Sequence, residues 1–272
     1  MLKTAPLQPR AHGAVRLSVK RGPGGGTALN SLRPSGALKA LFPRPQGSAL
    51  EAVLVNTAGG VTGGDSFSGT FHAEAGTALT LTTQTAERGY RALPNEVAEL
   101  QTHITAGHGA HVQWLPQETI LFQGAAINRR LRVELAAKAS FLMVEPLVFG
   151  RAAMGEVLTE GRFTDRIEIY RDGQIAYLDG LSLRGNISAQ LAHAHIGGGA
   201  GAMASLVYIA PDAEARLTPL RALLGPLGGV SLRAPDMLVL RCMAPDSYLL
   251  RKTLIPALAL LTDHKIPRCW IS

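Results

Sequence analysis

The chain has 272 residues, of which 46% are hydrophobic and 17% charged, a balance typical of a folded globular protein. Its net charge of +7 is unevenly placed: residues 1–50 hold eight basic side chains and no acidic one, whereas the rest carries 19 basic and 20 acidic side chains. A nearly neutral body argues against general nucleic-acid binding, which needs basic groups on the body itself. The eight basic residues are Lys3, Arg10, Arg16, Lys20, Arg21, Arg33, Lys39 and Arg44.

Other totals exclude further classes of protein. Two cysteines, Cys242 and Cys269, are too few for a disulfide framework, so we expect a reducing, cytoplasmic compartment. No apolar run reaches the ~18 residues of a membrane-spanning helix, and the N-terminus lacks the apolar region of a secretory signal. Because no linker divides the chain, we expect a flexible N-terminal segment over residues 1–12 and a single domain over 13–272.

Apolar and polar residues alternate with period two through the first two thirds of the chain, which predicts β-strands. Phe67 to Ala73 alternate in this way, and a second strand follows a turn at Gly76. Similar strand–turn–strand units have turns at Gly107 and Lys138, so these three turns are spaced by 31 residues. A fourth unit turns at Arg171-Asp172-Gly173, and Asp-Gly between alternating strands is a strong hairpin signal.

A strand repeat of about thirty residues predicts either a β-solenoid, in which stacked units share one core, or a sandwich with evenly spaced hairpins. The spacing alone favours neither. In the last third, Asp212 could cap a short or bent helix that ends near Gly225. Asp246 or Ser247 could cap a second helix, which Pro256 should kink. The chain is therefore expected to be mostly β, with one or two late helices.

A glycine-rich segment from Asn56 to Asp65 follows one predicted strand and contains the pairs Gly59-Gly60 and Gly63-Gly64. Glycine pairs permit positive φ and close backbone approach. A phosphate-binding loop would continue with Lys, Ser or Thr and then a helix, but alternating strand residues follow. We therefore interpret the segment as a structural turn, whose backbone could donate hydrogen bonds to Asp65.

Two acids lie in apolar surroundings, Glu118 within residues 114–120 and Glu145 within 141–149. A buried carboxylate is unfavourable unless it is paired or functional. One interpretation pairs Glu145 with an interior arginine, for instance Arg151 or Arg166. The alternative interpretation is a functional role.

Histidines and nucleophiles lack the spacing of a known site. His103, His108 and His111 surround one turn, and His193 and His195 would share a strand face if extended, but neither set has a Cys or carboxylate at zinc-ligand spacing. There is no G-x-S-x-G motif, and neither cysteine has a local catalytic signature. The histidines are therefore interpreted as solvated surface residues.

Several motifs, taken in order, together resemble the UreD (UreH) family of urease accessory proteins. They are residues 56–65, Leu81-Thr82-Thr83-Gln84, residues 115–122, Gly150-Arg151 with Gly155-Glu156, Arg171-Asp172-Gly173 and the closing Ile266-Pro267-Arg268-Cys269-Trp270. The likeness runs from about residue 13 to the end. Thr57 stands where many family members have Pro, and Cys269 where an apolar residue is usual.

The resemblance implies a β-helical fold with a few helices, which favours stacked units over the sandwich. It also implies a maturation factor rather than an enzyme. UreD proteins bind urease apoprotein and recruit UreF and the GTPase UreG, and the assembly inserts nickel into urease. A water-filled path through UreD is the nickel route proposed for the family. We therefore expect no stably bound cofactor beyond transient Ni²⁺, no nucleic acid and no membrane partner.

Nickel(II) takes oxygen and nitrogen ligands, and transit requires weak sites that do not trap the ion. Isolated carboxylates suit this better than a closed Cys/His cage. The candidate path residues are Asp65, Glu118, Glu145, Glu156, Asp172 and Asp179. At the basic end of the chain, we expect Arg33, Lys39 and Arg44 to lie on a cationic face that steers an acidic partner surface.

Two other classes of function remain open on the residues alone. A carbohydrate-binding module would need exposed aromatic side chains on a strand face, and the chain has only two Trp, five Tyr and seven Phe. A hydrolase would need a carboxylate pair, such as Glu118 with Glu145, at the separation that glycosidases use.

Overall fold

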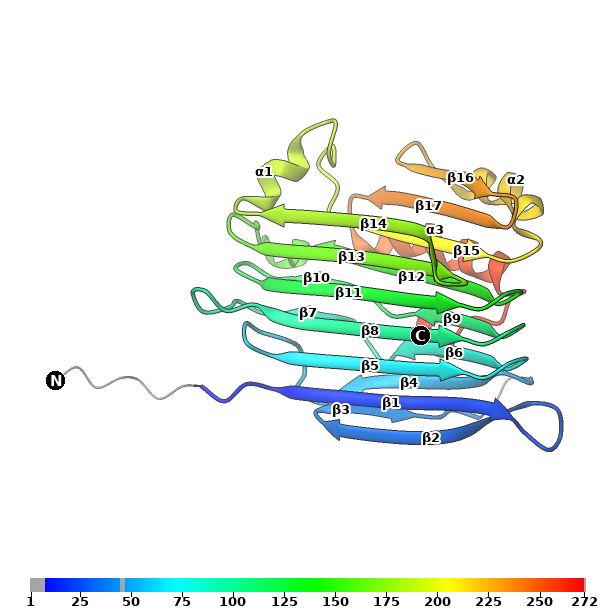
Figure 1. Cartoon of the computed structure of the whole chain (residues 1–272). Coiled ribbons are helices and arrows are strands. Elements are labelled where there is room, and N and C mark those ends of the chain that lie inside the picture. Colours follow the sequence, from blue (N-terminus) through cyan, green and yellow to red (C-terminus); the bar gives the residue numbers. More distant parts are fainter. Residues whose placement is uncertain (1–7, 45–46, 272) are drawn as a thin grey trace.

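Two β-sheets face each other, and the chain passes repeatedly from one to the other in a computed structural model that describes residues 8–44 and 47–271 (Figure 1). Most of the predicted segment 1–12 therefore lies outside the described residues. Sheet A contains, in spatial order, β14 (Gln174–Arg184), β13 (Arg162–Arg171), β11 (Ala126–Leu135), β8 (Ala98–Ala106), β5 (Ser66–Ala73), β1 (His12–Arg21) and β2 (Thr27–Gly36).

Sheet B lies behind sheet A in Figure 1. It contains β16 (Gly228–Ala234), β17 (Met237–Ala244), β15 (Ala202–Ile209), β12 (Ser140–Phe149), β9 (His111–Leu115), β6 (Ala78–Thr83), β4 (Leu50–Asn56) and β3 (Leu38–Leu41). Two short strands, β7 (Glu87–Gly89) and β10 (Thr119–Leu121), pair in parallel with each other, and β10 also pairs with the end of β12. They join sheet B at one side of the core.

Successive coils stack in parallel, which confirms the solenoid. Strands β5, β8, β11 and β13 are parallel neighbours in sheet A, while β4, β6, β9 and β12 are parallel neighbours in sheet B. Each coil thus places one long strand in each sheet, and the coils form a solenoid of about four turns. Antiparallel strands flank this stack at both ends.

The 31-residue spacing of the turns is close to the length of one coil, since residues paired on neighbouring coils are 29 to 36 positions apart in the sequence. At the corner between the sheets, the amide of Gly107 donates to Ala73 O, and the amide of Ala136 donates to Ala106 O, so each corner rests on the previous one. The fourth turn is different: the chain reverses within sheet A at Asp172-Gly173, with positive φ of 49° and 79°, and pairs β13 with β14 antiparallel. A nearly regular spacing of turns therefore includes three corners and one true hairpin.

The core follows the alternation of the strands. In β5, each residue of one parity is buried and each of the other is exposed, as predicted. Strand β12 is buried on both faces, because one side faces sheet A and the other lies under the C-terminal helices. This double burial explains the continuous apolar run around Glu145.

Two helices form where the sequence predicts them. Helix α2 (Ala213–Leu223) and helix α3 (Ser247–Leu261) pack on the outer face of sheet B (Figure 1). Asp246 caps α3 by accepting a 2.8 Å hydrogen bond from the amide of Leu249. Asp212 precedes α2 without capping it, because its carboxylate accepts hydrogen bonds from Tyr208 Oη and Arg216 Nε instead.

A third helix, α1 (Ile187–Ala192), was not predicted because six residues are too few for a helical period to be visible. Asn186 caps it. His193 and His195 follow it in an exposed turn, so the extended strand considered for them is wrong. Two short 3₁₀ segments, Ala152–Met154 and Arg268–Trp270, complete the described chain, in which no helix is long and apolar enough to cross a membrane.

Candidate functional site

Charged side chains, which are rare in a solenoid core, meet between the two sheets at Glu145. This residue points from β12 into the interior and is 6% exposed. Its carboxylate accepts a 2.7 Å hydrogen bond from Trp114 Nε1 and lies 2.6 Å from Arg129 Nη1. Burial raises the pKa of Glu145, and the charge of Arg129 acts against that rise.

The arginine partner proposed for Glu145 needs correction. Arg151 pairs with Glu156, and Arg166 pairs with Glu168, so neither reaches Glu145. Arg129 takes that place because it lies on β11 of the opposite sheet, facing inward. The interpretation of an interior ion pair is therefore right, but its partner is not.

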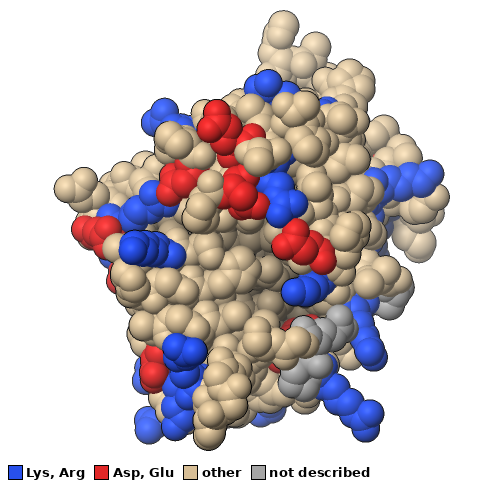
Figure 2. Space-filling view, turned by 90° about the vertical axis from the view of Figure 1, so that its right-hand side faces the viewer, with Lys and Arg blue, Asp and Glu red and all other residues tan. Residues whose placement is uncertain are grey.

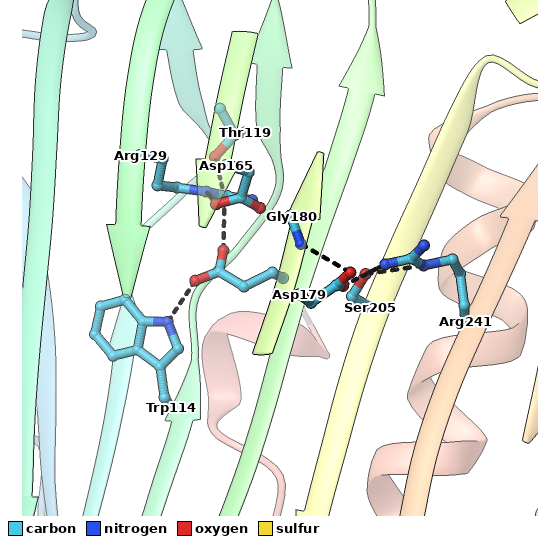
Figure 3. Close-up of polar contacts among 9 residues, drawn as sticks. Trp114, Thr119, Arg129, Asp165, Asp179, Gly180, Ser205 and Arg241 are labelled. Carbon is cyan, nitrogen blue, oxygen red and sulfur yellow. Dashed lines mark hydrogen bonds and ion pairs between the residues drawn. The ribbon is translucent and has the colours of Figure 1, made fainter. Parts of the chain in front are cut away.

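Arg129 is held from several sides (Figure 3). Its Nε and Nη2 donate to the two carboxylate oxygens of Asp165 at 3.0 and 2.7 Å, and its Nη1 donates to Thr119 Oγ1 at 3.1 Å. The guanidinium carbon also lies 5.3 Å from the centre of the Phe163 ring. Burial acts to lower the pKa of Arg129, but the charges of Asp165 and Glu145 outweigh it and raise that pKa above its ordinary value.

A second ion pair lies farther along the same interior, between β14 at the edge of sheet A and β17, the last strand but one of sheet B. Asp179 of β14 pairs with Arg241 of β17, whose guanidinium also approaches Ser205 Oγ at 3.3 Å (Figure 3). The side chain of Asp179 is 20% exposed and that of Arg241 is 44% exposed, so this pair lies where the interior meets solvent. Asp179 is thus the second predicted path residue that the structure places in the interior.

Two hollows follow this ionic row. The larger has a volume of about 190 Å³ and is bordered by exposed Gln84 and Thr85 at one end and by Trp114 farther in. The smaller, of about 10 Å³, is bordered by Asp165, Asp179, Ser205 and Arg241. The two share Arg129 and Glu145 as lining residues.

Glu87 lines the larger hollow and was not predicted. Asn56 Nδ2 donates to both of its carboxylate oxygens at 3.1 Å. Burial raises the pKa of Glu87, and the hydrogen bonds from Asn56 act against that rise. The coil length offered a signal, since Asn56 and Glu87, like Trp114 and Glu145, are 31 residues apart. Partners one coil apart lie side by side.

The glycine-rich segment forms the turn that holds Asn56 in place. Asn56 Nδ2 also donates to Gly60 O at 3.0 Å, and its Oδ1 accepts from the amide of Ala58 at 2.9 Å. Gly60 has φ of 150°, and a β-carbon there would lie 2.6 Å from Arg88 O. Gly59 and Gly64 also have positive φ, and a β-carbon at Gly63 would lie 2.7 Å from that of Glu96.

Asp65 stabilises the same glycine-rich turn through its side chain. Its two carboxylate oxygens accept 2.8 Å hydrogen bonds from the amides of Thr62 and Ala11, and the residue is 5% exposed. Asp65 therefore holds the glycine turn and the start of β1 together.

Glu118 lies outside the two hollows, under α3. Its carboxylate accepts a 2.8 Å hydrogen bond from Arg251 Nη1, which also reaches Gln117 Oε1 at 2.8 Å. Arg251 Nη2 donates to Trp270 O at 2.7 Å, so the cluster fastens the chain's end to sheet B. Glu118 and Glu145 thus belong to separate clusters and do not form a facing carboxylate pair.

The two remaining predicted path acids lie near the surface. Glu156 accepts hydrogen bonds from the guanidinium and amide of Arg151, and the side-chain bond holds the pKa of Glu156 at about 2. Asp172 is exposed at the hairpin between β13 and β14. The structure therefore brings Glu145 and Asp179 to the interior row, and Asp65, Glu118, Glu156 and Asp172 to other places.

The predicted partner-binding residues Arg33, Lys39 and Arg44 are exposed at the end of the solenoid formed by β1, β2 and β3. Arg33 pairs in register with Arg16 of β1, so like charges are neighbours there. Within the described residues none of these four forms an ion pair. Figure 2 shows several basic side chains along the lower part of one face, where few acidic ones are visible, and further basic side chains higher up among most of the visible acidic ones.

The other metal-ligating residue types do not converge: the described part of the chain has no group of three or more His, Cys, Asp or Glu that could hold a metal ion. His111 bonds to Ser140 Oγ and Gln113, and His103 lies 3.4 Å from Glu134. Cys242 is buried under the helices, where burial raises its pKa to about 11.

Sequence comparison decides the family. The family described as "UreD urease accessory protein" matches residues 11–270. The chain belongs to the UreD family of urease accessory proteins. It is 54% identical to "Urease accessory protein UreD" of Ruegeria pomeroyi over 90% of this chain and 95% of the relative, and 50% identical to that of Roseobacter denitrificans over 99% of both. A relative from a Chelativorans species is 44% identical over 98% of this chain. The resemblance noted from the motifs is thus confirmed, and with it a role in urease maturation.

Proposed function

We propose that this chain is a non-enzymatic urease maturation factor that binds urease apoprotein, recruits UreF and through it UreG, and offers Ni²⁺ a route between its two sheets. The observation that carries the proposal is the ionic row between the sheets. It runs from the hollow bordered by Gln84 and Thr85, past Glu87 and Glu145, to the solvent-facing pair of Asp179 and Arg241.

The chemistry of the row suits a passing dication. Ni²⁺ accepts carboxylate oxygens as ligands, but one or two carboxylates hold it far less tightly than a closed set of thiolates and imidazoles. Each carboxylate of the row already has a protein partner: Asn56 for Glu87, Arg129 for Glu145 and Asp165, and Arg241 for Asp179. An entering ion would have to compete with these partners, which keeps each step weak. We therefore place the path lining at Glu87, Glu145, Asp165 and Asp179.

The cationic end supports the part of the proposal that concerns partners. Arg33, Lys39 and Arg44 are all exposed at the β1–β3 end of the solenoid. Basic groups at this end would attract an acidic protein surface. We propose that this end steers a partner of the maturation complex. Because exposed charges act mainly on the encounter rate, the effect should depend on salt.

Complementation tests the proposal as a whole. A bacterial strain with urease but without its own UreD is given this chain, and urease activity is measured along with the proteins that co-purify with it. The proposal predicts restored nickel-dependent activity and co-purification of urease subunits with UreF. A chain that folds in that strain but neither restores activity nor captures either partner contradicts it.

A further inference from the structure

The two hollows between the sheets meet at one place, and an arginine stands there. Arg129 and Glu145 are the residues that border both the larger hollow and the smaller one. Any small polar species that moved along the interior would therefore have to pass the guanidinium of Arg129. The side chain of Arg129 is 10% exposed and that of Glu145 is 5% exposed, so this point is closed to bulk water.

The bonds of Arg129 are unequal in a way that matters for passage. Asp165 is bound by two parallel hydrogen bonds, and the guanidinium also packs near the Phe163 ring. Glu145 is bound through Nη1 alone. Bidentate pairs hold their geometry better than single contacts. Glu145 is therefore the partner that Arg129 releases first, while Asp165 keeps the guanidinium on the sheet A side.

Glu145 can be released without losing its place. Trp114 Nε1 donates to Glu145 Oε1, whereas Arg129 takes Oε2. If Arg129 withdraws, Oε2 becomes available to a cation from the larger hollow while Oε1 remains fixed by the indole. Such a carboxylate would offer the cation one oxygen ligand whose position is already fixed.

We propose that Arg129 is the gate of the interior path, a built-in cation that occupies Glu145 and yields it to a passing Ni²⁺. The inference rests on the proposed function for the identity of the cation. Arg129 has two effects: its positive charge repels the dication, and it neutralises one of two adjacent carboxylates that would otherwise trap the ion. Without the guanidinium, Glu145 and Asp165 would present two uncompensated negative charges to the same hollow.

Charge arithmetic at this cluster makes the proposal testable on the purified chain. Wild type carries one net negative charge among Arg129, Glu145 and Asp165, Arg129→Gln carries two, and the double variant Arg129→Gln/Asp165→Asn again carries one. Asp165→Asn alone carries no net charge at this cluster and leaves Glu145 as the carboxylate partner of Arg129. Affinity for Ni²⁺, measured by equilibrium dialysis, should therefore be highest in Arg129→Gln, about tenfold or more above wild type. It should be near wild type in the double variant and lowest in Asp165→Asn.

The matched control is Arg132→Gln on the same strand, where the side chain is 39% exposed, pairs with Glu134 and borders neither hollow. It should leave the affinity for Ni²⁺ unchanged. Thermal melting verifies that each variant folds, and if Arg129→Gln does not, the order among the other three still decides. An affinity of folded Arg129→Gln within twofold of wild type overturns the gate, as does a double variant that binds as tightly as the single one.

Urease activation separates this inference from the function on which it rests. In the strain lacking its own UreD, Arg129→Gln should slow the appearance of urease activity at limiting nickel, and the double variant should recover it. If wild type itself restores no activity, the proposed function fails whatever the dialysis shows. If wild type restores activity and Arg129→Gln does so at the same rate, the gate fails and the function stands.

Discussion

Removing Arg251 tests whether Glu118 has a structural role. This arginine supplies hydrogen bonds to Gln117, Glu118 and Trp270 O, and its guanidinium lies 5.1 Å from the Trp270 ring centre. Arg251→Met keeps the length of the apolar stem but leaves the Glu118 carboxylate, whose side chain is 9% exposed, without its cation. The chain's end also loses the hydrogen bond that joins Trp270 O to α3.

The expected loss in the free energy of unfolding lies between two limits. Breaking a fully buried ion pair by removing one partner destabilises a protein by about 3–5 kcal/mol, and an exposed pair contributes about 1 kcal/mol or less. The Arg251 side chain is 23% exposed, so the effect belongs below the buried range. We expect a loss of about 2–3 kcal/mol in the free energy of unfolding, which for a chain of this size lowers Tm by roughly 5–10 °C.

Thermal and urea denaturation followed by circular dichroism measure this loss. Lys252→Met is the matched control, because Lys252 is the next residue of α3 and is exposed, and it should change Tm little. On a Glu118→Gln background, Arg251→Met should have a smaller effect, since no buried charge is left behind. A fall in Tm below about 2 °C for Arg251→Met, or an equal fall on both backgrounds, would refute the structural role.

Three further outcomes are expected. Gly60→Ala should lower the free energy of unfolding by about 2–3 kcal/mol, because its β-carbon would meet Arg88 O. Gly59→Ala, with open space around the added carbon, should lower it by about 1 kcal/mol. Equal losses in the two variants would contradict the crowding at Gly60. The raised pKa of Glu87 means that the folded state holds a proton more tightly than the unfolded chain, so wild-type stability should fall relative to Glu87→Gln as pH rises above about 4.5. Parallel urea-denaturation curves from about pH 5 to pH 8 would count against that burial. Reversing the charge of Arg33, Lys39 and Arg44 together should slow association with the partner complex about tenfold at low salt and weaken its salt dependence, as stopped-flow binding would detect; association that ignores both reversal and salt would contradict steering.

Most of the fold could be predicted from two features of the sequence, the alternation of apolar and polar residues and the repeat of strand–turn–strand units. Period two in residues 66–73 predicted the burial of β5, and the 31-residue spacing of Gly76, Gly107 and Lys138 is close to the length of one coil. Local pattern could not show that the chain changes sheets at these turns but reverses within one sheet at Asp172-Gly173. That difference arises from where the next strand finds a free edge, which is a tertiary property.

Only some residues of the ionic row could be predicted from the sequence, for a related reason. Glu145 and Asp179 were singled out from the sequence, but Glu87 lies in a polar stretch that gives no sign of burial. Arg129 lies beside Arg130, and only the pleat decides that one faces the core and the other solvent. Conversely, Glu118 was grouped with Glu145 as an acid in apolar surroundings, yet it pairs with Arg251 of α3 outside the ionic row. Which face an acid occupies depends on strand phase, which a short run with Pro116 does not define.

Nickel content of matured urease tests the central claim most directly. Urease is purified from the strain lacking its own UreD after complementation with wild type, with Glu87→Gln/Glu145→Gln, or with the surface control Glu134→Gln/Glu214→Gln, and nickel per active site is measured. An interior route predicts that nickel falls severalfold with the first double variant alone, while urease subunits and UreF still co-purify with it. Full nickel loading by a folded Glu87→Gln/Glu145→Gln chain would contradict passage of the ion between the two sheets.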